Sequence, residues 1–261
     1  MSSKKIPRLL KIKDYITLLG TSLGMIALIC ACIGDHATLS LGFFLISIST
    51  GTDMIDGYIA RKTKTMNEMG KELDSLSDSL TFGIAPAILT YQSFKTDSLF
   101  DIILVIGAIF FAIGAILRLA RFNLSEVPGY TGVPTPISAL LLTLYFYANY
   151  FYAFGKGGIT YPFLEGASYL IPFIMILIAW FNITVYISFG EKDKTIYTTF
   201  LIVAPLCPIF GIIGILNPNF LISMIVSIFF LSSFLFTLVF IIRGFFLYFS
   251  KKELQIISNE K

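Results

Sequence analysis

Long apolar runs separated by short polar breaks recur along the whole chain. They lie near residues 15–34, 38–60, 74–92, 99–119, 135–154, 168–188, 197–216 and 220–247. Each run is close to the roughly 20 residues that a helix needs to cross a hydrocarbon core of about 30 Å. The breaks are rich in Gly, Pro, Asn and charged residues, as expected of turns between helices. The pattern therefore predicts an all-α, polytopic transmembrane helix bundle of about eight spans.

The composition excludes a water-soluble domain. Of the 261 residues, 56% are hydrophobic and only 13% are charged, so polar side chains are too few to cover a soluble fold. We expect an integral membrane protein whose main surroundings are the lipid bilayer, with no nucleic acid as a partner. The three cysteines, Cys30, Cys32 and Cys207, fall in apolar runs and are interpreted as small hydrophobic residues.

The basic residues predict an orientation. Of the 19 Lys and Arg residues, all except Lys95 and Lys156 flank the predicted spans on one side. The positive-inside rule then places both termini and the even-numbered loops in the cytoplasm. Residues 1–14 form a basic juxtamembrane arm. Its mixture of bases and aliphatic residues suits a short helix on an anionic leaflet, or it is a topology signal only.

Four aspartates stand out near the cytoplasmic ends of the second and third runs. Asp53 and Asp56 are three residues apart, and Asp74 and Asp78 are four apart, so each pair shares one face of its helix. A short turn joins the two helices, which lets the pairs face each other. Four crowded carboxylates need counter-charge, and two divalent cations, Mg²⁺ or Mn²⁺, are the simplest source of it. Such a pair of metals can clamp both oxygens of a phosphoryl displacement.

Small residues and one base accompany the aspartates. Gly57, Ala60 and Gly70 would let a bulky nucleotide approach the helix backbone, and Arg61 would meet a phosphate oxygen. Two simpler interpretations stay open. Glycines in membrane helices often serve helix packing, and aspartates at a membrane edge can mark helix ends.

The pattern Asp-x2-Asp-Gly-x2-Ala-Arg-x8-Gly-x3-Asp-x3-Asp resembles, at every fixed position, the signature of the CDP-alcohol phosphatidyltransferase family. The resemblance implies a six-helix core with a site open to the cytoplasm, a CDP-linked lipid donor, release of CMP and a homodimer. It implies metal binding by all four aspartates, with Asp78 also acting as general base. The implied CDP-binding residues are Asp53, Asp56, Gly57, Ala60, Arg61, Gly70 and Asp74.

The resemblance also implies a layout within a single integral membrane domain, 1–261. The basic arm, 1–14, precedes a catalytic six-helix core over 15–190. Two additional spans follow over 191–250, and a polar tail occupies 251–261.

Segments after the aspartates are similar to the phosphatidylserine synthase branch of the family, including archaeal relatives that use ether lipids. They are Ser79-Leu-Thr-Phe-Gly-Ile-Ala-Pro86-Ala, Arg118-Leu-Ala-Arg-Phe-Asn123 and Gly132-Val-Pro-Thr-Pro136. This implies L-serine as the acceptor. Arg118 and Arg121 would bind its carboxylate, and Asn123 would accept from its ammonium group. The alternative is that both arginines are interfacial anchors.

Two other functions are compatible with parts of the sequence. Glycerol phosphate or inositol phosphate as the acceptor would use the same chemistry. A cation transporter would need ionisable residues spread over several spans. Here the acids gather on two neighbouring helices, and the runs after residue 135 offer almost no ionisable path. The sequence does not distinguish an ester-linked donor lipid from an ether-linked one.

Overall fold

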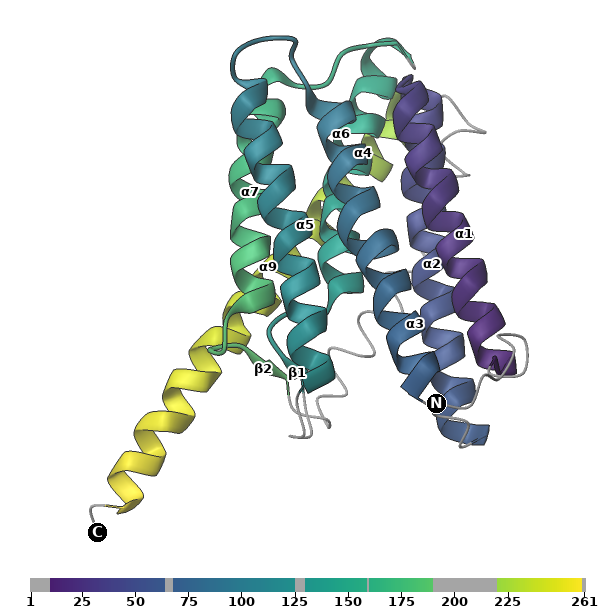
Figure 1. The fold of residues 1–261 in the computed structure, drawn as a ribbon. Coiled ribbons are helices and arrows are strands. Elements are labelled where there is room, and N and C mark those ends of the chain that lie inside the picture. The colour runs from purple at the N-terminus through teal and green to yellow at the C-terminus, as the bar shows by residue number, and fades with distance from the viewer. Residues whose placement is uncertain (1–9, 64–67, 125–129, 159, 190–219, 260–261) are drawn as a thin grey trace.

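The computed structural model describes residues 10–63, 68–124, 130–158, 160–189 and 220–259, and shows an all-helical bundle (Figure 1). The helices are α1 (Ile12–Ile33), α2 (His36–Thr63), α3 (Glu68–Asp78), the π-helical η2 (Ser79–Ile84), α4 (Ala85–Phe94), α5 (Asp101–Leu124), α6 (Thr135–Gly157), α7 (Glu165–Ile183) and α9 (Phe220–Asn259). The strands β1 (Tyr130–Thr131) and β2 (Ser188–Phe189) form one short antiparallel pair. The predicted all-α class is confirmed.

Within the described residues, 6 helices are long and apolar enough to cross a membrane. They coincide with six of the predicted runs. The run at 74–92 falls on α3, η2 and α4, which follow one another from Glu68 to Phe94 and are divided by the π-helical section. The run at 197–216 lies outside the described residues. The structure therefore agrees with a polytopic membrane protein.

Several helix ends differ from the predicted limits, among them those of α7 and α9. α7 ends at Ile183 instead of continuing to residue 188, because the chain turns there into β2. α9 continues to Asn259, so that most of the predicted polar tail, 251–261, is helical. The residues Lys251-Lys-Glu-Leu-Gln255 are good helix formers, which explains the extension.

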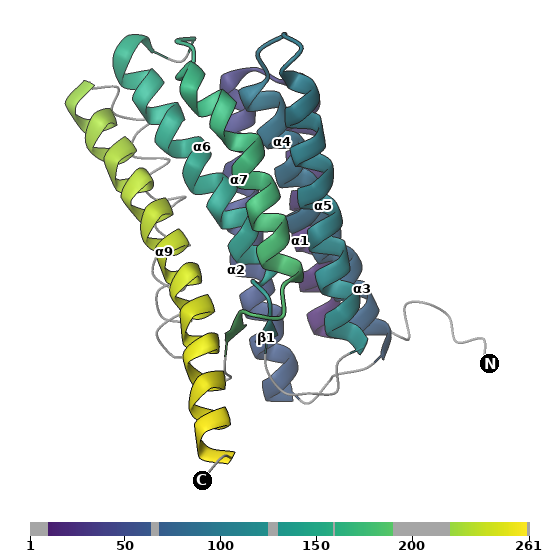
Figure 2. The same ribbon diagram turned by 90° about the vertical axis from the view of Figure 1, so that its left-hand side faces the viewer.

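α6 lies at the centre of the bundle and is buried along most of its length (Figure 2). Its aromatic rings interlock with those of neighbouring helices. The Phe146 ring stacks on Phe43 of α2 with centroids 4.2 Å apart, and the Tyr147 ring stacks on Phe230 of α9 at 5.1 Å. The outer helices instead expose large apolar side chains, such as Ile29, Phe110 and Phe173. An apolar outer surface around an aromatic centre fits a bilayer environment.

Glycines let α5 and α7 approach closely. A Cβ atom placed on Gly107 would lie 3.0 Å from the Pro172 Cα, and one on Gly114 would lie 2.9 Å from the Ala179 Cα. Both helices start at the same end of the bundle, so these contacts keep them parallel and close. As a result, the last turns of α5 and α7 lie side by side.

Candidate active site

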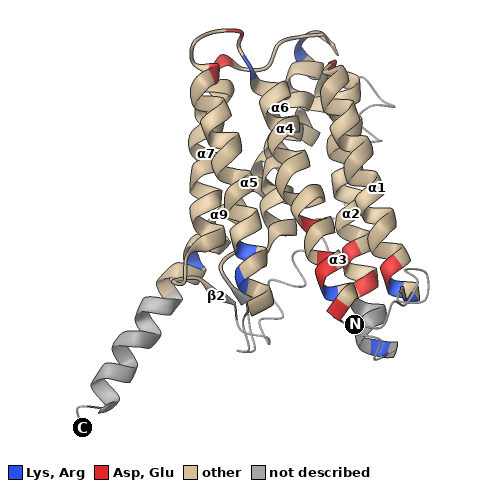
Figure 3. Ribbon diagram, in the orientation of Figure 1, with Lys and Arg blue, Asp and Glu red and all other residues tan. Residues whose placement is uncertain are grey.

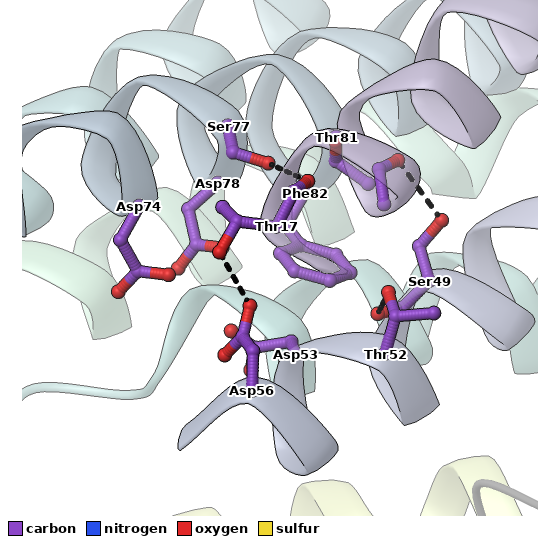
Figure 4. Close-up of a pocket in the computed structure, with 11 residues that line it drawn as sticks. Thr17, Ser49, Thr52, Asp53, Asp56, Asp74, Ser77, Asp78, Thr81 and Phe82 are labelled. Atoms are coloured by element: carbon purple, nitrogen blue, oxygen red, sulfur yellow. Dashed lines mark hydrogen bonds between the residues drawn. The ribbon is translucent and has the colours of Figure 1, made fainter. Parts of the chain in front are cut away.

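The four predicted aspartates are brought together where α2 meets α3 (Figure 4). Asp53, Asp56 and Asp74 each offer a carboxylate oxygen, and these three atoms lie within 4.8 Å of one another. Asp78 lines the same cleft, one turn further along α3 than Asp74. The structure thus groups three carboxylates tightly and adds the fourth beside them.

Carboxylate oxygens at this spacing suit a hard divalent cation. Mg²⁺ and Mn²⁺ prefer oxygen ligands, and three convergent carboxylates supply them from two helices. Asp56 is buried, with 6% of its surface exposed. A buried carboxylate beside others is costly without counter-charge. The residues present therefore fit a divalent metal.

Hydroxyl groups of α1 tie the two acidic helices together. The Thr17 hydroxyl donates to the Asp56 carboxylate at 2.7 Å. The Ser77 hydroxyl, on α3 between Asp74 and Asp78, donates to the Thr17 carbonyl at 3.3 Å, and the Thr21 hydroxyl donates to Ser77 at 2.7 Å. α1 is therefore the third wall of the site. Sequence reasoning missed it, although Thr17 and Thr21 lie four residues apart on one face of the first run.

The aspartates line a narrow cleft. Besides the acids, its lining consists of small, mostly hydroxyl-bearing residues and one ring: Thr17, Gly20, Ser49, Thr52, Ser77, Thr81 and Phe82. η2 begins directly after Asp78, and the Ala85 N–H at its end bonds to the Leu80 carbonyl five residues back. Single turns of π-helix occur often at functional sites. Here the π-helical turn brings Thr81 and Phe82 into the cleft.

The other predicted CDP-binding residues lie along the same helices. Gly57 follows Asp56 in α2, and Gly70 is buried in α3, four residues before Asp74. Ala60 and Arg61 belong to the last turn of α2, but their side chains lie outside the described part of the structure. Their roles remain predictions.

The three predicted serine-binding residues have different surroundings in the structure. Arg118 is buried, with 5% of its surface exposed, and its positive charge acts on the Asp78 carboxylate. Its guanidinium also lies 5.4 Å from the centre of the Phe122 ring. Burial and a charge that acts on the proposed general base distinguish Arg118 from the other two residues.

Arg121 and Asn123 contact protein groups instead. The Arg121 guanidinium donates to the carbonyls of Ile183 at 2.6 Å and Asn182 at 3.1 Å, at the C-terminal end of α7. The Asn123 amide donates to the Ser75 hydroxyl at 2.9 Å, and Lys71 donates to the Asn123 carbonyl at 2.8 Å. Among the described residues, the Asn123 Oδ1 atom is buried and has no hydrogen-bond partner. That oxygen is still available as an acceptor.

The site is at the basic end of the bundle. Figure 3 shows the acidic residues of α3 at the same end of the bundle as the two arginines near the end of α5. Lys95 follows α4, and Lys156 lies in the last turn of α6, both at the opposite end. The distribution agrees with the asymmetry seen in the sequence.

Comparison with known proteins identifies a family. The sequence profile described as CDP-alcohol phosphatidyltransferase matches residues 11–185. A CDP-diacylglycerol–serine O-phosphatidyltransferase of Methanocaldococcus jannaschii is 41% identical over 137 residues, which are 52% of this chain and 61% of that protein. An archaetidylserine synthase of Methanothermobacter thermautotrophicus is 34% identical over 155 residues, 58% of this chain and 64% of that protein.

A third relative, the CDP-diacylglycerol–serine O-phosphatidyltransferase of Bacillus subtilis, is 33% identical over 141 residues, 51% of this chain and 78% of that protein. The chain thus spans somewhat under two thirds of the length of the two archaeal relatives. The matched profile covers every aspartate of the site and both arginines of α5. The protein described here belongs to the CDP-alcohol phosphatidyltransferase family.

Proposed function

We propose that this protein transfers a phosphatidyl-type group from a CDP-linked lipid to L-serine and releases CMP. One observation carries the proposal: Asp53, Asp56 and Asp74 offer carboxylate oxygens within 4.8 Å of one another, and Asp78 lines the same cleft. The carboxylates would hold the divalent cations that bind the donor diphosphate, and the buried Arg118 would bind the carboxylate of the acceptor. The names of the archaeal and Bacillus relatives support serine as the acceptor.

In the proposed reaction, the serine hydroxyl oxygen attacks the phosphorus that carries the lipid. The bond from that phosphorus to the CMP oxygen breaks, and CMP leaves with the electron pair. Two bound divalent cations would neutralise the diphosphate and stabilise the attacking and leaving oxygens. Asp78 takes up the hydroxyl proton as general base. Its place beside the three-carboxylate group, instead of within it, supports this separate role.

The acceptor would be oriented from the α5 side. Arg118 holds the serine carboxylate by charge-assisted hydrogen bonds, because its guanidinium is fixed by burial. Asn123, with an unused Oδ1 atom among the described residues, accepts from the serine ammonium group. Arg121 serves this arrangement indirectly, because its bonds to α7 fix the end of the helix that carries Arg118.

Orientation and assembly belong to the same proposal. The positive-inside bias supports a site and both termini on the cytoplasmic side. The matched range, 11–185, supports a catalytic core close to the predicted 15–190. A homodimer is supported by the family resemblance.

The test measures CMP release by the purified protein in detergent, with CDP-diacylglycerol or CDP-archaeol as donor and Mg²⁺ or Mn²⁺ present. L-serine, glycerol 3-phosphate and inositol phosphate are supplied separately as acceptors. Of the three acceptors, we expect only L-serine to give CMP release. We expect this release to stop when EDTA removes the metal. Release with either phosphate acceptor but not with serine overturns the serine assignment. The absence of CMP release with every acceptor and both donors overturns the enzyme proposal and favours the transporter alternative.

A further inference from the structure

We infer that Lys13 and Asp14, at the start of α1, are positioning residues whose fixed, opposite charges set the affinity of the carboxylate cluster for divalent cations. The inference rests on the proposed metal site. It assigns a function to two residues that the sequence pattern places in a basic surface arm or at its edge.

The Lys13–Asp14 pair is buried, unlike an ordinary surface ion pair. Lys13 has 8% of its surface exposed and Asp14 has none. The Lys13 ammonium lies 3.0 Å from Asp14 Oδ1, and the Lys11 N–H donates to Asp14 Oδ2 at 2.7 Å. A lysine that only marked membrane topology would extend into the headgroups. Lys13 is held inside the protein instead.

The pair also reaches the site. The Lys13 carbonyl accepts a hydrogen bond from the Thr17 hydroxyl at 3.2 Å, and the same hydroxyl donates to Asp56 at 2.7 Å. The positive charge of Lys13 acts on Asp56 and on Asp74, and the negative charge of Asp14 acts on Asp74. These are two of the three carboxylates that converge for a metal. Both charges therefore act on the proposed ligands from one turn of α1.

Opposite charges at a metal site have opposite effects on cation affinity. The Lys13 ammonium attracts the carboxylates and repels an incoming cation, so it competes with the metal. It also compensates part of the cluster's charge when no metal is bound. Asp14 limits this competition because it pairs with Lys13 and adds negative charge next to Asp74. If the pair had only a packing role, substitution of Lys13 and substitution of Asp14 would not change the cation affinity in opposite directions.

The test titrates Mn²⁺ into the purified full-length protein in detergent and measures free Mn²⁺ by electron paramagnetic resonance. Lys13→Met is expected to bind Mn²⁺ about five-fold more tightly, the factor that Coulomb's law gives for a unit charge and a divalent ion about 8 Å apart at a water-like dielectric constant. Asp14→Asn is expected to bind it more weakly by about the same factor. Lys13→Arg, which keeps the charge, and the double variant Lys13→Met/Asp14→Asn should both stay within about two-fold of the unmodified protein.

Lys95→Met is the control, since it removes an exposed lysine from the other end of the bundle. It should leave the Mn²⁺ titration unchanged. Weaker binding by both single variants, or no change in Asp14→Asn, overturns the inference. If Lys13→Met does not fold, as judged by thermal unfolding in EDTA, the double variant and Asp14→Asn still decide it. If the unmodified protein itself binds no Mn²⁺, the proposed metal site fails and this inference fails with it. Normal binding with unchanged variants overturns this inference alone.

Discussion

Arg118 and Arg121 lie three residues apart at the same end of α5, yet the structure gives their guanidinium groups different neighbours. Arg118 is buried, and its charge acts on Asp78 of the acidic cluster. Arg121 is half-buried and bonds to the last carbonyls of α7. The difference comes from what lies beside each one. The C-terminal end of a helix leaves carbonyls without intrahelical partners, and α7 ends next to Arg121. Identical residues with helical spacing can therefore have different neighbours, and we propose that Arg118 binds the acceptor whereas Arg121 fixes the end of α7.

The largest expected effect comes from removing the carboxylate on which the charge of Arg118 acts. In Asp78→Asn we expect kcat for CMP release to fall about 1,000-fold, the typical loss when a general base is removed. Mn²⁺ binding should change only a few-fold, because Asp53, Asp56 and Asp74 keep their oxygens together. Both quantities are measured on the same preparation.

Asp97→Asn is the control for that substitution. Asp97 is exposed, lies in the loop before α5 and has a positive φ of 54°, which asparagine also tolerates. Its kcat should be unchanged. A kcat for Asp78→Asn within ten-fold of the unmodified protein, with donor and metal bound, would contradict the role of Asp78 as general base.

The next largest effect separates the two arginines by substrate affinity. Arg118→Gln removes a charged hydrogen-bond donor, and the KM for L-serine should rise about 30-fold, within the range for a charge-assisted hydrogen bond. Removal of a buried charge that acts on Asp78 should lower thermal stability as well, so the rise in KM is the quantity that distinguishes Arg118 from Arg121. Steady-state kinetics with varied serine at saturating donor checks this. A normal KM together with lowered stability would make Arg118 an architectural residue like Arg121.

Arg121→Gln is expected to lower stability but to leave the KM for serine nearly unchanged. Loss of its two hydrogen bonds to α7 should lower the free energy of unfolding by about 1–3 kcal/mol. The KM for serine should stay within about two-fold, since the guanidinium is already bonded to Asn182 and Ile183. Thermal unfolding in detergent and serine kinetics measure the two quantities. A large rise in the KM for serine without a loss of stability would instead indicate that Arg121 binds serine.

The acidic half of the site was accessible from the sequence because local rules determine it. Spacings of three and four residues put each pair of aspartates on one helix face, and a short turn makes the two faces meet. Neither step needs knowledge of distant contacts. The structure brings these aspartates together within the cleft. Most spans were predictable for a similar reason, since hydropathy over about 20 residues is a local property.

The contributions of α1, α6 and α7 depend on contacts between distant residues, and so they were not predicted. The sequence of Lys13 and Asp14 looks like part of a basic arm, and only their burial beside Asp56 and Asp74 shows otherwise. The partner of Arg121 is a pair of carbonyls 61 and 62 residues away. α6 is no more apolar than α2, yet it forms the centre of the bundle, because its rings fit those of α2 and α9.

The smallest expected effect concerns Thr17. Like Arg121, Thr17 bonds to a neighbouring helix: its hydroxyl donates to Asp56 of α2, whereas Arg121 donates to the end of α7. Thr17→Val keeps the shape of the side chain but removes the hydrogen bond to Asp56. We expect a loss of about 1 kcal/mol, which corresponds to about five-fold weaker Mn²⁺ binding. Asp56 would then have to be ordered by the metal itself.

The matched control for Thr17→Val is Ser22→Ala, since the Ser22 hydroxyl is exposed and bonds only within α1, to the Leu18 carbonyl. It should leave the Mn²⁺ titration unchanged. Equal effects of both substitutions would mean that α1 responds as a whole and that Thr17 has no specific part in placing Asp56. A five-fold effect of Thr17→Val alone would show that a neutral hydroxyl on α1 orders a ligand on α2. The effect of Thr17 would then come from geometry, whereas that of Lys13 comes from charge, because the substitution leaves the charge of the site unchanged.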